Sequence, residues 1–153
     1  PVICALIYYM LKKQGLLTKD KKLLLILFAV SFFLTEVGRS IYRPEIYEHG
    51  INDFHIADTL GTSFGTFTAI FFVLLLQGKN KLSDMFYIIV ITVVIMIYEA
   101  LGLPGNETYD IYDMYSALLC GVIAGVFYFL HFIWFPFKRS KKPATEEKSI
   151  DTD

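Results

Sequence analysis

Long apolar runs alternate with short polar islands along the chain, and this pattern predicts a helical membrane protein. Four runs approach or exceed the roughly 20 apolar residues that a helix needs to cross a hydrocarbon core of about 30 Å. They cover residues 23–41, 54–76, 85–102 and 111–135. None shows the period-two alternation of a half-buried strand, and a backbone inside hydrocarbon must satisfy its own hydrogen bonds. We therefore expect an all-α membrane protein built as a bundle of four transmembrane helices.

Composition agrees with this class of protein and excludes others. The chain has 153 residues, of which 55% are hydrophobic and 19% are charged, whereas soluble domains carry about a quarter charged residues. The formal net charge of −1 gives no basic surface for nucleic acid. Cys4 and Cys120 lie in apolar runs and have neither CxxC spacing nor a nearby His, so they predict no disulfide framework and no zinc site.

Basic residues predict how the chain is oriented in the membrane. They precede the first run, separate the second from the third and follow the fourth, as Lys12, Lys13, Lys19, Lys21, Lys22, Lys79, Lys81, Lys138, Arg139, Lys141, Lys142 and Lys148. Only Arg39 and Arg43 lie on the other side. Because Lys and Arg avoid translocated loops, we expect a multi-pass protein of the cell membrane with both termini in the cytoplasm.

Three regions follow from this division of the chain. Residues 1–22 form an apolar segment and a basic linker, residues 23–137 form the membrane domain, and residues 138–153 form a polar tail that we expect to be disordered. Residues 1–11 are apolar all round but too short to span the bilayer alone. We favour a short helix at the cytoplasmic interface, and a clipped or tilted additional span is the alternative.

Aromatic and small residues add expectations about depth and packing. Rings at the two predicted membrane boundaries are Tyr42, Tyr47, Tyr98, Tyr109, Tyr112 and Tyr115 on the outer side and Tyr87, Tyr128 and Trp134 on the inner side. Tyr and Trp favour headgroup depth. Gly61 and Gly65, and likewise Gly121 and Gly125, form small-xxx-small pairs that allow helices to approach closely. The second run is also rich in hydroxyls, which can bond between helices or line a polar cleft.

Acidic residues gather at the predicted outer side. They are Glu36, Glu45, Glu48, Asp53, Asp58, Glu99, Glu107, Asp110 and Asp113. Four of these, one per predicted helix, lie inside the apolar runs at about 5–9 Å below the outer boundary, as Glu36, Asp58, Glu99 and Asp113. An ionisable group at such depth is costly unless it is paired or faces water, so it marks a candidate functional site.

In a bundle these acids would converge, and bundles build carboxylate metal sites from inward-facing positions. The candidate residues for a ligand or ion cleft are Asp58, Glu99, Asp110, Asp113, Glu36, Arg39 and His55. The candidates for metal ligands are Asp58, Glu99 and Asp113, and a divalent cation is the cofactor that such a set would take. No catalytic residue is identified.

Structural roles remain open for several of these residues. Glu36 and Arg39 lie three residues apart on one helix face, where they can neutralise each other. Asp58 lies near a helix start, where the helix dipole favours an anion. Both residues therefore have an explanation that needs no ligand.

Of the remaining acids, two have a structural explanation and one does not. Asp110 is a natural N-cap for the fourth helix, and Asp113 falls in the first turn of that helix. Glu99 lies near a helix C-terminus, where the dipole disfavours negative charge, so it has no such explanation. Glu99 is accordingly the residue to test first.

The segment EALGLPGNETYDIYD (residues 99–113) resembles the VanZ-like family of small bacterial membrane proteins. In that family a Glu ends one span, a Pro-Gly loop follows, and two Asp three residues apart open the next helix. The segment NDFHIAD (residues 52–58) is similar to the start of the second helix of the family. The chain departs from the family pattern at Gly102, where the family carries Gln near this place, and at Ala117, where it carries Asn.

The resemblance implies a protein of the bacterial cell envelope, in a family associated with resistance to glycopeptides such as teicoplanin and without an agreed biochemical activity. Our leading hypothesis is a non-enzymatic accessory or binding protein. Its acidic extracytoplasmic cleft would recognise a cationic or glycopeptide-like ligand, an envelope precursor or a partner membrane protein. The alternative is a metal-dependent membrane enzyme that acts on a lipid-linked or envelope substrate through clustered carboxylates. An ion-coupled transporter is a weaker third hypothesis, because no carboxylate lies at mid-bilayer depth.

Overall fold

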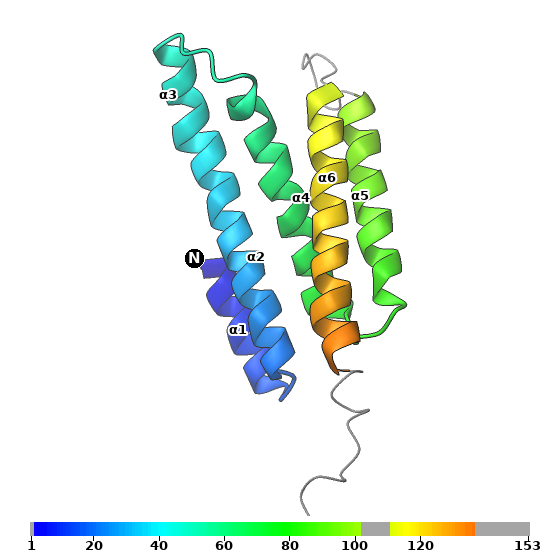
Figure 1. Ribbon diagram of the computed structural model, residues 1–153. Coiled ribbons are helices and arrows are strands. Elements are labelled where there is room, and N and C mark those ends of the chain that lie inside the picture. The colour runs from blue at the N-terminus through cyan, green and yellow to red at the C-terminus, as the bar shows by residue number, and fades with distance from the viewer. Residues whose placement is uncertain (1, 102–110, 137–153) are drawn as a thin grey trace, which may run out of the picture.

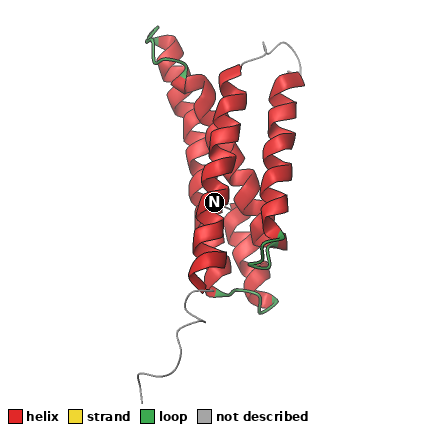
Figure 2. Cartoon of the chain, turned by 45° about the vertical axis from the view of Figure 1, so that its right-hand side comes forward, coloured by secondary structure: helices red, strands yellow, loops and turns green. Residues whose placement is uncertain are grey.

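The structure is a computed structural model that describes residues 2–101 and 111–136, and this part of the chain is all helical (Figures 1 and 2). The elements are α1 (Val2–Lys13), α2 (Lys19–Val37), η1 (Gly38–Tyr42), α3 (Arg43–Glu48), α4 (Ile56–Gln77), α5 (Asp84–Leu101), α6 (Ile111–Tyr128) and η2 (Phe129–Trp134), where η marks π-helical turns. Within the described ranges, four helical segments are long and apolar enough to cross a membrane, namely Lys19–Glu48, Ile56–Gln77, Asp84–Leu101 and Ile111–Trp134. The prediction of four membrane-spanning helices is confirmed at this level.

Helix α4 is the central element of the bundle. It packs against α2, α5 and α6, while α5 and α6 pack against each other. Because successive spanning segments run in opposite directions, their ends gather at two poles (Figure 1). We call the pole with α3, the start of α4, the end of α5 and the start of α6 the acidic end. The opposite pole, with the turns at residues 14–18 and 78–83, is the basic end.

The apolar core lies towards the basic end. Leu24 of α2 and Ile70, Leu74 and Leu75 of α4 are completely buried there, together with Tyr128 of α6. Towards the acidic end, by contrast, residues 58–65 of α4 are all only half-buried. Residues 58–65 therefore add no buried side chain to the core, although Ala57 directly before them is buried.

Helix α1 runs beside α2 in the opposite direction, along the half of the bundle nearer the basic end (Figure 1). Leu11 is buried in the core, and Cys4 and Ile7 pack against it. Tyr9 and Met10 remain exposed. The placement of α1 at a membrane interface stays a prediction, since the contacts with α2 fix the helix against the bundle and not against a bilayer.

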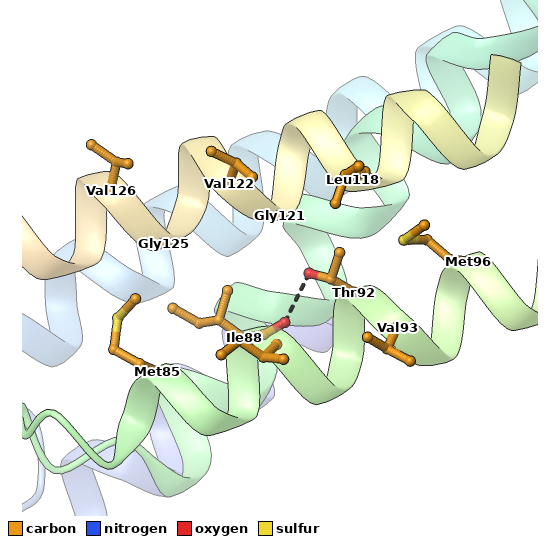
Figure 3. Close-up of a pocket in the computed structure, with 11 residues that line it drawn as sticks. Met85, Ile88, Thr92, Val93, Met96, Leu118, Gly121, Val122, Gly125 and Val126 are labelled. Carbon is orange, nitrogen blue, oxygen red and sulfur yellow. Dashed lines mark hydrogen bonds between the residues drawn. The ribbon is translucent and has the colours of Figure 1, made fainter.

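Of the four glycines in the small-xxx-small pairs, Gly121 shows the closest helix packing. A methyl group at Gly121 would lie 2.2 Å from Oγ1 of Thr92, a buried residue of α5 whose hydroxyl donates to the Ile88 carbonyl (Figure 3). At Gly125 the nearest atom would be Cε of Met85, at 3.4 Å. The same face of α5 and α6 forms an open apolar groove of about 280 Å³ (Figure 3).

The first small-xxx-small pair, Gly61 and Gly65, does not bring two helix backbones as close together. A methyl group at Gly65 would meet nothing within 4 Å, and one at Gly61 would lie 3.1 Å from Cγ of Arg39. Gly61 therefore makes room for an arginine side chain, whereas Gly65 makes no close approach.

Candidate functional site

Asp58 is the centre of a cluster at the acidic end. It lies in the first turn of α4, as the dipole argument predicts, with its side chain 25% exposed. The Tyr47 hydroxyl donates a hydrogen bond to its carboxylate. Nη2 of Arg43 lies 3.4 Å from Oδ1, and Nδ1 of His55 lies 3.6 Å from Oδ2. Asp58 thus joins α3 to the start of α4 and is compensated by its own neighbours.

The turn before α4 places His55 in this cluster. Phe54 and His55 have φ values of 57° and 66°, a left-handed conformation that non-glycine residues rarely adopt. Two side chains support the turn: Asn52 accepts from the Phe54 amide at 3.2 Å, and Asp53 accepts from the Ala57 amide at 2.6 Å. The turn brings the His55 ring against the start of α6.

The His55 ring stacks on the ring of Tyr112 in the first turn of α6, with centroids 5.3 Å apart and planes 16° apart. Asp113, the next residue, also lies in this first turn, as predicted. Its carbonyl accepts a hydrogen bond from Ser116 at 2.9 Å. Through His55 and Tyr112, the Asp58 cluster therefore extends from α3 and α4 to α6.

Glu99 also lies at the acidic end, where it bonds to Thr62, a residue outside the Asp58 cluster. It lies near the end of α5 and accepts a hydrogen bond from Oγ1 of Thr62 at 3.3 Å. Thr62 is one turn after Asp58 along α4. A hydroxyl of the central helix thus satisfies a carboxylate that the dipole of α5 disfavours. This bond confirms that a hydroxyl of this helix bonds between helices.

The other hydroxyls of α4 mostly bond within their own helix. Thr66 donates to the Thr62 carbonyl at 2.7 Å, and Thr68 donates to the Phe64 carbonyl at 2.8 Å. Thr68 also lies 3.4 Å from the hydroxyl of Thr35 in α2. These bonds satisfy the hydroxyls inside a membrane helix without any ligand.

Glu36 and Arg39 do not form the pair that their spacing favours. Both are exposed, and no ion pair joins them in the part of the chain that the structure describes. The Arg39 stem lies over Gly61 of α4 instead. Contact with a neighbouring helix has therefore replaced pairing along one helix.

The structure does not assemble the proposed metal ligands. Among residues 2–101 and 111–136, no three His, Cys, Asp or Glu side chains are grouped as a metal site requires. The carboxylate of Asp58 contacts side chains of α3, whereas the carboxylate of Glu99 accepts a hydrogen bond from Thr62 of α4. Asp110 and the loop that carries part of the VanZ resemblance lie outside the described residues.

Asp84, at the basic end, is a buried acid that the sequence analysis missed. It is only 1% exposed and begins α5. Its Oδ2 accepts hydrogen bonds from the amides of Lys79 and Lys81, at 2.8 and 3.0 Å, and from the Tyr128 hydroxyl at 2.7 Å. The ring of Tyr128 is completely buried in the bundle, and its predicted depth near the inner membrane boundary stays a prediction.

Residues of α2 complete this network. Nζ of Lys21 donates to the carbonyls of Leu74 and Leu75 at 3.1 and 2.5 Å, near the C-terminus of α4. Asn80 donates to Asp20 at 2.5 Å. We call Asp20, Lys21, Asn80, Asp84 and Tyr128 the basic-end clasp. It ties the start of α2, the turn between α4 and α5, and the end of α6 together.

A local signal for Asp84 exists, because a Ser-Asp pair directly before an apolar run is typical of a helix start. The burial of the residue depends on Tyr128, which lies 44 positions away. In the part of the chain that the structure describes, four helical segments have the length and hydropathy of the spans of a multi-pass membrane protein. Comparisons with protein-family models, with curated proteins and with solved structures find no match to this chain.

Proposed function

We propose that the chain is a VanZ-like protein of the bacterial cell membrane that acts as a non-enzymatic binding protein at the cell envelope. Its acidic end faces the extracytoplasmic side, and both termini are cytoplasmic. The distribution of Lys and Arg supports this orientation, because the turns at residues 14–18 and 78–83 lie at one pole, and lysines flank the first turn and lie within the second.

The observation that carries the proposal is the meeting of separate chain segments at the acidic end. Asp58 joins α3 to α4, His55 joins α4 to α6, and Glu99 joins α5 to α4. A ligand at this end would therefore contact residues from all four spanning segments. Such an end concentrates cations and cationic groups of larger ligands.

We assign the principal ligand-binding role to Glu99. Arg43, Tyr47 and His55 already compensate the Asp58 carboxylate, so Asp58 chiefly positions α3 against α4. Glu99 lies at the unfavourable end of a helix dipole and accepts a hydrogen bond from Thr62, so the helix that carries it does not offset its negative charge. An amino group of a glycopeptide such as teicoplanin is a ligand of this chemistry.

The test is teicoplanin binding to the detergent-purified full chain, compared between Glu99→Gln and a matched control, Glu48→Gln. Glu48 is an exposed acid at the same end, in the last turn of α3. We expect Glu99→Gln to weaken binding by about tenfold, since one charge-assisted contact is lost, and Glu48→Gln to change it little. Equal binding by the wild type and Glu99→Gln, or no binding by the wild type, contradicts the proposal.

Elemental analysis of the same preparations tests the enzymatic alternative. The binding proposal predicts no stoichiometric divalent metal and no requirement for one. A metal present at one ion per chain and lost in Glu99→Gln would overturn the binding proposal in favour of a metal-dependent enzyme. A Glu99→Gln variant that merely fails to accumulate would assign Glu99 a structural role and overturn the proposal as well.

A further inference from the structure

Within residues 2–101 and 111–136, Arg39 is a cation at the acidic end that forms no ion pair with a carboxylate. Among the described residues, no Asp or Glu oxygen lies within ion-pair distance of its guanidinium, although Arg43, one turn later, pairs with Asp58 at 3.4 Å. Two acids of this end have other partners: Glu45 lies 3.4 Å from His49, and Asp58 is held by α3. Arg39 is also one of the only two basic residues outside the basic segments of the chain.

The depth of Arg39 matches lipid phosphates. The continuous segment Lys19–Glu48 begins with lysines and becomes apolar at Leu23. At about 1.5 Å per residue, a hydrocarbon core of about 30 Å that begins at Leu23 ends near Arg43. Arg39 lies one turn below this boundary, and an arginine stem is long enough to raise its guanidinium to headgroup level.

The side chain of Arg39 is also positioned. A methyl group at Gly61 would lie 3.1 Å from Cγ of Arg39 and 3.6 Å from Cδ, so the stem rests directly on the backbone of α4. This contact limits the rotamer freedom of the long side chain, so less conformational entropy is lost when the guanidinium binds a ligand. A guanidinium presents its N–H groups as a planar fork that matches two phosphate oxygens.

We propose that Arg39, held on α4 by Gly61, binds the phosphate group of a lipid in the leaflet at the acidic end. The inference goes beyond the proposed recognition of a cationic ligand by Glu99 and requires only that the helices cross a bilayer. Glu36, three residues before Arg39, lowers the affinity for an anion, so the site favours a phosphate that approaches from headgroup level above it.

The experiment measures lipid retention by native mass spectrometry on the full chain, with short-chain phosphatidylglycerol, short-chain phosphatidylcholine and inorganic phosphate as probes. Arg39→Gln removes the charge, and we expect it to lower the affinity for phosphatidylglycerol by about tenfold. Arg39→Lys keeps the charge but loses the fork, so we expect an intermediate affinity. Glu99→Gln should retain the lipid as the wild type does, which separates this site from the proposed cation site.

Two glycines provide a matched pair that tests the positioning. Gly61→Ala places a methyl group against the Arg39 stem, whereas Gly65→Ala, one turn further along α4, meets nothing within 4 Å. We expect Gly61→Ala to lower lipid affinity while keeping the charge of Arg39, and Gly65→Ala to leave the affinity unchanged. Both variants carry the same residue in the same helix, so a difference between them reports on Arg39.

The probes distinguish the source of the phosphate. Displacement of the lipid by inorganic phosphate supports a site for the phosphate group alone, and retention against inorganic phosphate supports a lipid headgroup site. Equal retention of phosphatidylglycerol by the wild type and Arg39→Gln would overturn the proposal. Equal loss in Gly61→Ala and Gly65→Ala would overturn the positioning by Gly61.

Discussion

The two poles of this bundle hold their charges in different ways. At the basic end, Asp84 is buried and receives three hydrogen bonds, from two backbone amides and a tyrosine hydroxyl. At the acidic end, Asp58 is 25% exposed and its partner Arg43 is 44% exposed. A buried carboxylate with three hydrogen bonds contributes chiefly to stability, whereas an ion pair between partly exposed charges contributes little to stability. The comparison predicts that the basic end contributes more to stability than the acidic end, where we propose that recognition takes place.

Removal of the buried carboxylate should have the largest effect on stability. Asp84→Ala leaves two amides and the Tyr128 hydroxyl without their acceptor, so we expect a loss of about 3 kcal/mol in the free energy of unfolding. Denaturation in mild detergent, followed by circular dichroism, measures it. A loss no larger than that of Asp58→Ala would remove the distinction between the poles.

Close packing between α5 and α6 gives the next prediction. Gly121→Ala forces a methyl group to 2.2 Å from the Thr92 hydroxyl, so we expect a loss of about 2 kcal/mol. Gly125→Ala is the control, because its methyl group would lie 3.4 Å from the flexible end of Met85. The same unfolding measurement compares the two, and equal stabilities would show that α5 can move away from Gly121 without cost.

Tyr128→Phe isolates one bond of the basic-end clasp. The ring stays buried, while Asp84 loses the hydrogen bond of 2.7 Å and keeps those from Lys79 and Lys81. We expect a loss of about 1.5 kcal/mol, since the bond involves a charged acceptor. A variant as stable as the wild type would show that the two amides alone satisfy the carboxylate.

Asp58→Asn should have the smallest effect on stability. The pair with Arg43 is exposed, so its loss should cost less than about 1 kcal/mol. Hydrogen exchange at α3 should nevertheless increase, because Asp58 and its bond from Tyr47 hold α3 on α4. Unchanged exchange in α3 would contradict the positioning role that we assign to Asp58.

The parts of this fold that depend on composition were predictable, and those that depend on tertiary neighbours were not. Four apolar runs predicted four helices because hydrocarbon leaves the backbone no other partner. The helix-start positions of Asp58 and Asp113 followed from the local order of residues. The spacing of Glu36 and Arg39 allowed a pair along one helix, but no ion pair joins them among the described residues, and the Arg39 stem lies on Gly61 of another helix.

The clasp shows the same limit at the other pole. Lys21 has the position of a topological marker before an apolar run, but it caps the end of α4, 53 and 54 residues away. Tyr128 has the position of an interface aromatic, but it bonds Asp84 inside the core. Neither the contacts of Lys21 nor the bond of Tyr128 can be predicted from neighbouring residues in the sequence, since each depends on which helix ends meet at the basic end.

The most direct test of the account is the side of the membrane to which each pole belongs. In a background with Cys4 and Cys120 replaced by Ser, single cysteines at Glu48 and at Lys81 place one exposed label at each pole. An impermeant maleimide applied to intact cells should label Glu48→Cys at once and Lys81→Cys only after lysis. Labelling of Lys81→Cys in intact cells, with Glu48→Cys protected until lysis, would reverse the orientation and contradict extracytoplasmic recognition at the acidic end.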